Sequence, residues 1–117
     1  METKSNDGRI DYIEFHATDI AATKTFFTGV FGWRFTDYGP DYTSFEDGRI
    51  AGGFARAESV KPTGPLVVIY SSGLEAMEAK VKAAGGAIVK EIFSFPGGRR
   101  FHFTDPSGNE LSVWSDH

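Results

Sequence analysis

The sequence of 117 residues contains no cysteine, which excludes disulfide bonds, zinc–thiolate sites, iron–sulfur clusters and a cysteine nucleophile. Basic residues are also in the minority, with 12 Lys and Arg against 16 Asp and Glu, so we expect no nucleic-acid partner. The longest apolar run, residues 66–70, is far shorter than the ~20 residues that cross a bilayer, and the N-terminus has no signal-peptide core. We therefore expect one cytoplasmic domain with no membrane partner.

Aromatic residues, in contrast, are abundant: the chain has 11 Phe, 4 Tyr and 2 Trp. One interpretation is that they fill the core of a small β-rich domain, with Phe26, Phe27 and Phe31 behind a sheet. The other is that some of them line a hollow that holds a ligand.

The order of the expected elements repeats once along the chain. Alternation and turn residues predict a strand over 10–16, a helix from the cap Thr18-Asp19 to Gly32, and strands over 33–38, 42–46 and 50–55. The second half gives a strand over 66–71, a helix over 74–84, and strands over 87–93, 99–104 and 110–115. We expect a disordered tail at 1–8 and a single domain over 9–117, made of repeat one (9–57), a linker (58–64) and repeat two (65–115).

Phe15 corresponds to Ile69 and Gly32 to Gly86 at one constant offset, which supports an internal repeat. The predicted fold class is therefore α+β, with two βαβββ repeats that form a curved mixed sheet around a cavity.

Three stretches resemble the vicinal oxygen chelate superfamily of glyoxalases, bleomycin-resistance proteins and extradiol dioxygenases. They are Ala17-Thr18-Asp19-Ile20 with the Phe26-Phe27 pair and Val30-Phe31-Gly32-Trp33, then Ala84-Gly85-Gly86, and finally the turn 103–111, which reads Phe-Thr-Asp-Pro-Ser-Gly-Asn-Glu-Leu. The resemblance covers about residues 9 to 115 and implies the glyoxalase/bleomycin resistance fold.

Metal-dependent members of that superfamily place histidine, glutamine or glutamate ligands on the first strand of each half and near the last strand. The resemblance puts Tyr12, Leu66 and Ser112 at these positions, and none of the three is a good ligand for a divalent cation. We therefore predict no metal and no other cofactor. The alternative is a divalent metal in a rearranged site formed by Glu14, His16 and His102.

Alternation, combined with those inward positions, selects the candidate site residues. Glu14 and His102 are the candidate catalytic acid/base pair, and the structural interpretation is that Glu14 only pairs with Arg100 or His102. The candidate ligand-binding residues are Tyr12, His16, Tyr70, Arg100, Ser112 and Trp114.

Two glycine-containing segments each allow two interpretations. The segment 93–100 is either a lid over the ligand or an ordinary hairpin connection, and Gly52-Gly53 indicates a close backbone approach at a cavity floor or a dimer contact. The leading hypothesis is a metal-independent protein that binds a small hydrophobic or aromatic molecule. The alternatives are a glyoxalase-like lyase or isomerase that uses Glu14 and His102, and a module that serves only as a dimerising subunit. The resemblance also implies a homodimer.

Overall fold

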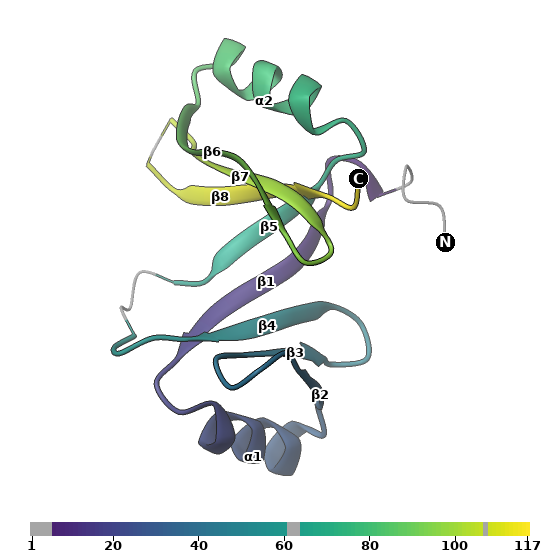
Figure 1. The fold of residues 1–117 in the computed structure, drawn as a ribbon, viewed down its shortest axis with the longest axis vertical. Helices are drawn as coiled ribbons and strands as arrows, with labels where there is room; N and C mark the ends of the chain where they lie inside the picture. Colours follow the sequence, from purple (N-terminus) through teal and green to yellow (C-terminus); the bar gives the residue numbers. More distant parts are fainter. Residues whose placement is uncertain (1–5, 61–63, 107) are drawn as a thin grey trace. The chain divides into compact units, whose positions relative to one another are not determined.

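A computed structural model describes residues 6–60, 64–106 and 108–117, and divides the chain into two compact units (Figure 1). Tyr12–Leu66 forms the first unit, and residues 6–11 together with Val67–His117 form the second. The element order is βαβββ followed by βαβββ, which confirms the predicted α+β class and its repeat. The predicted linker 58–64 includes residues 61–63, and the predicted tail includes residues 1–5; both of these segments lie outside the described residues.

The first half contains β1 (Ile10–Ala17), α1 (Ile20–Phe31), β2 (Arg34–Asp37), β3 (Tyr42–Glu46) and β4 (Ala51–Arg56). Its strands lie in the order β2-β3-β4-β1. The β1–β4 pair is parallel, because α1 and a hairpin separate these strands in sequence, whereas the other pairs are antiparallel.

Helix α1 begins and ends where the cap residues predict. Asp19 has extended backbone angles and its Oδ1 accepts a hydrogen bond from the Ala22 amide at 3.0 Å. Gly32 ends the helix with φ 73°, a left-handed conformation that glycine adopts without strain. The cap positions α1 on one face of the sheet of the first unit.

Ala17, Phe45 and Phe54 form the buried core of this unit, and Phe27 and Trp33 stack against it. The predicted burial of Phe26 and Phe31 is wrong, since these side chains are 55% and 61% exposed. Phe26 lies about 100° around the helix from Phe27, and Phe31 is the last residue of α1. The helix therefore has apolar residues on more than the face that packs against the sheet.

The second half contains β5 (Leu66–Tyr70), α2 (Leu74–Ala83), β6 (Ala87–Phe95), β7 (Gly98–Thr104) and β8 (Glu110–Ser115). Its strands lie in the order β5-β8-β7-β6, and β5 is parallel to β8. Leu74, Phe101 and Val113 form the buried core between α2 and one face of this sheet. The opposite face of the same sheet carries the other side chains of β7 and β8.

The structure bears on the predictions for two segments of the second unit. Residues 93–100 form the hairpin connection that was one of the two interpretations, because β6 runs on to Phe95 and β7 starts at Gly98, with Gly97 at φ 114° in the tight turn. Near the N-terminus, the Gly8 amide donates to the Tyr70 carbonyl at 2.9 Å and the Asp7 carboxylate accepts from Ser72. Residues 7 and 8 are therefore held against β5.

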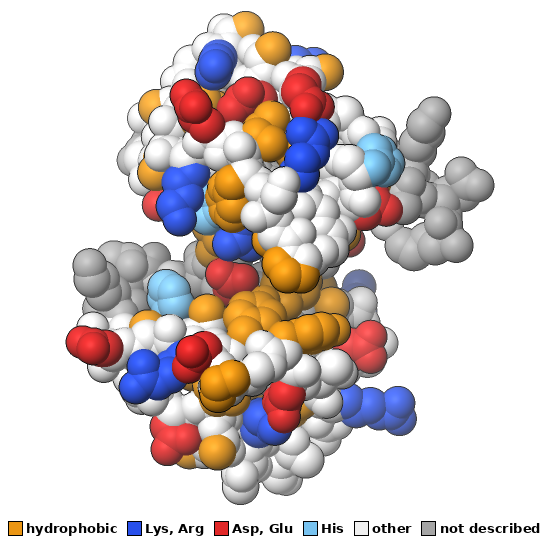
Figure 2. Space-filling view, viewed as in Figure 1, with side chains coloured by type: hydrophobic (Ala, Val, Ile, Leu, Met, Phe, Trp, Pro, Cys, Tyr) orange, Lys and Arg blue, Asp and Glu red, His pale blue; other side chains and the backbone are white. Residues whose placement is uncertain are grey.

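Acidic and basic side chains are interspersed on the visible surface (Figure 2). Among the described residues, the helices are too short to cross a bilayer.

Candidate functional site

Antiparallel pairing brings several of the predicted site residues onto one face of the second unit's sheet. Arg100 lies opposite Trp114 on β8 and opposite Phe93 on β6. His102 lies opposite Ser112 on β8 and opposite Lys90 on β6. Since Phe101 and Val113 point into the core on the other side, these residues share the face away from α2.

His102 pairs with Glu110 on this face. Its side chain is 7% exposed, and its Nδ1 lies 2.9 Å from Glu110 Oε2, whose side chain is 47% exposed. Burial lowers the pKa of His102 below its usual value of 6.5, and nearby Arg100 and Lys90 lower it further, while the hydrogen bond to Glu110 acts in the opposite direction. The imidazole is therefore neutral at pH 7.

The second nitrogen of His102, Nε2, is buried and has no hydrogen-bond partner among the described residues. An ionised carboxylate only accepts hydrogen bonds, so the neutral ring carries its proton on Nδ1 and its lone pair on Nε2. The pairing with Glu110 was not among the predicted interactions. The one sequence signal for this pairing is the position of His102 and Glu110 on either side of the predicted turn 105–109.

Aromatic rings and cations gather next to this histidine. The Arg100 guanidinium lies over the rings of Phe93 and Phe95, with centroid distances of 5.5 and 5.6 Å, and Lys90 Nζ lies 5.5 Å from the Phe93 centroid. The Phe93 ring is tilted against the His102 imidazole at 5.8 Å. The face therefore combines apolar area with positive charge.

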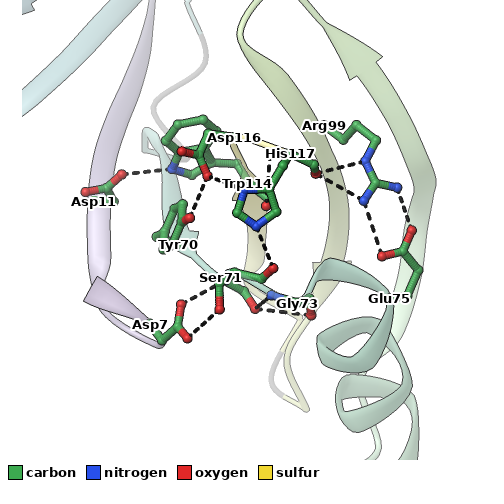
Figure 3. Close-up of polar contacts among 12 residues, drawn as sticks. Asp7, Asp11, Tyr70, Ser71, Gly73, Glu75, Arg99, Trp114, Asp116 and His117 are labelled. Atoms are coloured by element: carbon green, nitrogen blue, oxygen red, sulfur yellow. Dashed lines mark hydrogen bonds and ion pairs between the residues drawn. The ribbon is translucent and has the colours of Figure 1, made fainter. Parts of the chain in front are cut away.

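Polar contacts hold the two other predicted binding residues of this unit in place (Figure 3). The Tyr70 hydroxyl donates to Asp116 Oδ1 at 2.6 Å, which lowers the pKa of Asp116, and the Trp114 Nε1 donates to Asp11 Oδ2 at 2.8 Å. The two rings meet edge to face at 5.4 Å. Tyr70 is buried, so it supports the face, whereas Trp114 is half-buried and lies at the surface of the site.

A second cluster of polar side chains lies within the first unit. The Tyr42 hydroxyl donates to Glu14 Oε1 at 3.1 Å and contacts the Tyr12 hydroxyl at 2.6 Å. Because a phenol has one proton and Tyr42 donates it to Glu14, Tyr12 is the donor to Tyr42. Desolvation raises the pKa of Tyr42, and its contact with the Tyr12 hydroxyl and the charge of Glu14 raise it further, which keeps the Tyr42 phenol neutral.

Gly53 makes room for this cluster. A Cβ atom at that position would overlap the Tyr42 hydroxyl and lie 2.5 Å from the Tyr12 hydroxyl. A Cβ atom on the neighbouring Gly52 would overlap the Ile13 carbonyl and the Phe45 ring. The predicted close backbone approach at Gly52-Gly53 is therefore confirmed, and it comes from packing within the first unit.

The three positions that the resemblance aligns with the family's metal ligands do not fit a metal ion. Leu66 has no donor atom, and the Tyr12 hydroxyl is engaged by Tyr42. Ser112 is fully buried and its Oγ donates to the Phe101 carbonyl at 3.0 Å. Across the described part of the chain, no three His, Cys, Asp or Glu side chains gather into a set that could hold a metal ion.

The remaining site predictions are not brought together within either unit. His16 is exposed at the end of β1. Glu14 belongs to the first unit and His102 to the second, so their action as a pair, and a metal site that they would form with His16, stay predictions. A surface recess of about 360 Å³ in the first unit is lined by backbone and charged groups rather than by the predicted ligand-binding residues: Gly32, Arg34, Glu46, Asp47 and Gly48.

Paired βαβββ units, each with one helix on its sheet, define a class of α+β proteins to which this fold corresponds. Comparison with known families makes the assignment specific. The chain belongs to the glyoxalase/bleomycin resistance protein/dioxygenase superfamily, whose model matches residues 9–113.

Two curated relatives illustrate the range of the family. The anthracycline biosynthesis protein DauV of Streptomyces sp. (strain C5) is 30% identical over 133 residues, which cover 96% of this chain and 48% of that protein. CFP32 of Mycobacterium bovis, whose name suggests a glyoxylase, is 27% identical over 118 residues, which cover 92% of this chain and 45% of that protein. The chain thus spans about half the length of the curated relatives it matches.

Solved structures share the fold at low sequence identity. Methylmalonyl-CoA epimerase from Mycobacterium tuberculosis matches with a TM-score of 0.75 at 12% identity, over 100% of this chain and 93% of that one. The Mn(II)-bound glyoxalase from Novosphingobium aromaticivorans matches with a TM-score of 0.69 at 24% identity, over 92% of this chain and 38% of that one. These likenesses support the fold and leave the function to the site.

Proposed function

We propose that this chain binds a small hydrophobic or aromatic molecule and does so without the family's usual metal site. The observation that carries the proposal is the face of the second unit's sheet, where Phe93, Phe95 and Trp114 accompany Arg100. Flat apolar rings beside a guanidinium suit a planar aromatic ligand that carries polar or acidic substituents. At two of the family's metal-ligand positions, the hydroxyls of Tyr12 and Ser112 already make hydrogen bonds within the protein, which supports binding without a metal ion.

The relative DauV suggests an anthracycline as the first compound to test, because its name assigns that protein to anthracycline biosynthesis. The chain has two tryptophans: Trp33 stacks in the core of the first unit, and Trp114 lies on the proposed face. Trp33→Phe leaves Trp114 as the sole indole, and Trp114→Phe is the matched control.

We expect saturable quenching of the Trp114 fluorescence when the Trp33→Phe protein is titrated with an anthracycline in EDTA. The Trp114→Phe protein, whose remaining indole is partly buried against the core of the first unit, should show only the non-saturating loss that free N-acetyltryptophanamide also shows. Equal quenching in both variants, or none in either, would reject the proposed binding face.

The competing function is a glyoxalase-like lyase or isomerase that uses Glu14 and His102. One observation favours it, namely the buried and unpartnered Nε2 of His102, because a neutral imidazole with a bare nitrogen can act as a general base. A glyoxalase-type assay with an α-ketoaldehyde and a thiol tests it directly. If turnover is found and Glu14→Gln leaves it unchanged, Glu14 is structural.

The proposal includes a homodimer. On α1, the exposed fractions of Phe26, Val30 and Phe31 are 55%, 59% and 61%. The curated relative DauV is about twice as long as this chain, so two copies of the chain would together reach its length. We expect sedimentation to show a dimer that Phe31→Asp dissociates, whereas Val89→Asp, at an exposed position on β6, leaves it intact. A monomer at all concentrations would exclude the dimer.

A further inference from the structure

We propose that His102 and Glu110 form a proton-accepting site for the acidic hydroxyl of a phenol, an inference that deepens the proposed binding of an aromatic ligand. His102 is 5% exposed, its Nδ1 is 2.9 Å from Glu110 Oε2, and its buried Nε2 has no partner among the described residues. A buried polar atom without a partner is costly, and a ligand that donates a hydrogen bond removes that cost.

The geometry of the strands fixes this arrangement. Glu110 lies opposite Thr104, two residues along β7 from His102, so the two side chains are diagonal neighbours on one face. The carboxylate holds the ring by Nδ1 and leaves Nε2 as the acceptor, which is how a carboxylate orients a functional histidine. Glu110 is thus a positioning residue, because it acts through His102.

The surroundings of His102 favour a ligand that becomes negative. Within the described part of the chain, the charged side chains that act on the ring are Arg100, Lys90 and Glu110, two cations and one anion. The cations also lie over the Phe93 ring, which is tilted against the imidazole at 5.8 Å. An aromatic ligand that packs by Phe93 would hold its oxygen near both positive charges.

The proposed step is a simple proton transfer. The phenolic O–H bond breaks, its proton forms an N–H bond at His102 Nε2, and the electron pair stays on the phenolate oxygen. The resulting imidazolium is stabilised by the Glu110 carboxylate, and the phenolate is stabilised by Arg100 and Lys90. No oxidant, reductant or metal takes part.

Nitrogen-15 NMR of the histidine ring tests the first half of the proposal. The chain has three histidines, so the double variant His16→Gln/His117→Gln leaves His102 as the only signal. We expect the proton on Nδ1 in this protein, and a shift of population toward the Nε2–H tautomer when Glu110→Ala is added. Glu91→Ala removes an exposed carboxylate of β6 and should change nothing. Protonation on Nε2 while Glu110 is present would overturn the proposal.

4-Nitrophenol, whose absorption distinguishes phenol from phenolate, tests the second half. Slightly below the probe's own pKa, we expect the bound probe to show the phenolate band, and His102→Gln to weaken its binding about tenfold. A bound probe that stays neutral, or no binding at all, would overturn proton acceptance. If an anthracycline quenches Trp114 but 4-nitrophenol binds equally well to the His102→Gln protein, the proposed function stands and this inference alone is rejected. The reverse result would reject the anthracycline and keep the inference.

Discussion

Replacement of Gly53 by alanine tests the polar cluster of the first unit in the most local way. The added Cβ would overlap the Tyr42 hydroxyl and lie 2.5 Å from the Tyr12 hydroxyl. Both phenols must therefore move, which breaks the 2.6 Å contact between Tyr12 and Tyr42 and the 3.1 Å bond from Tyr42 to Glu14. The substitution removes no favourable contact of its own, so its effect reports on the cluster.

The magnitude follows from these losses. Two hydrogen bonds, one of them to a carboxylate, contribute together about 2–4 kcal/mol, and forcing a methyl group into a packed site costs about 1–3 kcal/mol. The gain in going from glycine to alanine within a strand offsets roughly 0.5–1 kcal/mol. We expect Gly53→Ala to lower the free energy of unfolding by about 2–4 kcal/mol once partial relaxation is allowed.

Urea denaturation followed by circular dichroism measures this change. Gly29→Ala is the matched control in the same unit, because a Cβ there meets no atom within 4 Å and lies in the interior of α1, where alanine is favoured by about 1 kcal/mol. In a Tyr42→Phe background, Gly53→Ala should cost at least about 1 kcal/mol less, since the hydrogen bonds are already lost. A neutral Gly53→Ala, or full additivity with Tyr42→Phe, would refute the cluster.

Three further predictions concern pH and packing. Because the pKa of Tyr42 is raised in the folded protein, the unfolded chain loses this proton first as the pH rises. The free energy of unfolding should therefore fall above pH 10, the usual pKa of tyrosine, and should fall less in Tyr42→Phe. Equal alkaline slopes for the two proteins in urea titrations would contradict this. Because the pKa of His102 is lowered in the folded protein, the unfolded chain binds the proton first as the pH falls. The free energy of unfolding should therefore be full above pH 6.5 and decline below it. In acid titrations, His102→Gln should make this decline less steep. Trp114→Phe should lower the free energy of unfolding by about 1 kcal/mol through loss of the bond to Asp11, whereas Asp11→Asn should retain part of that bond; an unchanged urea midpoint for Trp114→Phe would contradict its role.

The fold was predictable because its signals are local and repeated. The cap at Asp19, the left-handed glycine at Gly32 and the turn from Asp105 to Asn109 each depend on a few neighbouring residues. Asp105 accepts from the Asn109 backbone and side chain at 2.9 Å, so the turn residues select the hairpin that the sequence indicated. Ser107, within that turn, lies outside the described residues.

Local signals in the sequence are ambiguous where the same residue pattern fits two different local structures. Pro96 and Gly97 are typical both of a mobile loop and of a tight turn. The structure has the tight turn, because β6 and β7 stay paired up to the residues on either side of it. Phe26 and Phe31 fit a core by composition, but burial depends on which face of α1 meets the sheet. Neither choice can be made without the tertiary contacts.

The site was predictable only in part, because its pairings depend on strand register. The alternation that placed Arg100, His102 and Trp114 on one face holds in the structure. The partners of the key groups come from elsewhere: Tyr42 reaches Glu14 across the β1–β4–β3 pairing, and Glu110 reaches His102 diagonally. One residue of register shift would remove both contacts, and a single sequence does not fix that register.

Metal analysis of the purified chain tests the central claim, which is that a member of this superfamily binds its ligand without the family's metal. The protein should be prepared without a histidine tag and without chelator, and its zinc, nickel, iron and manganese content measured by mass spectrometry. We expect far less than one metal ion per chain, with anthracycline quenching of Trp114 unchanged by EDTA. One tightly held ion per chain, whose loss abolishes binding and whose return restores it, would contradict the account.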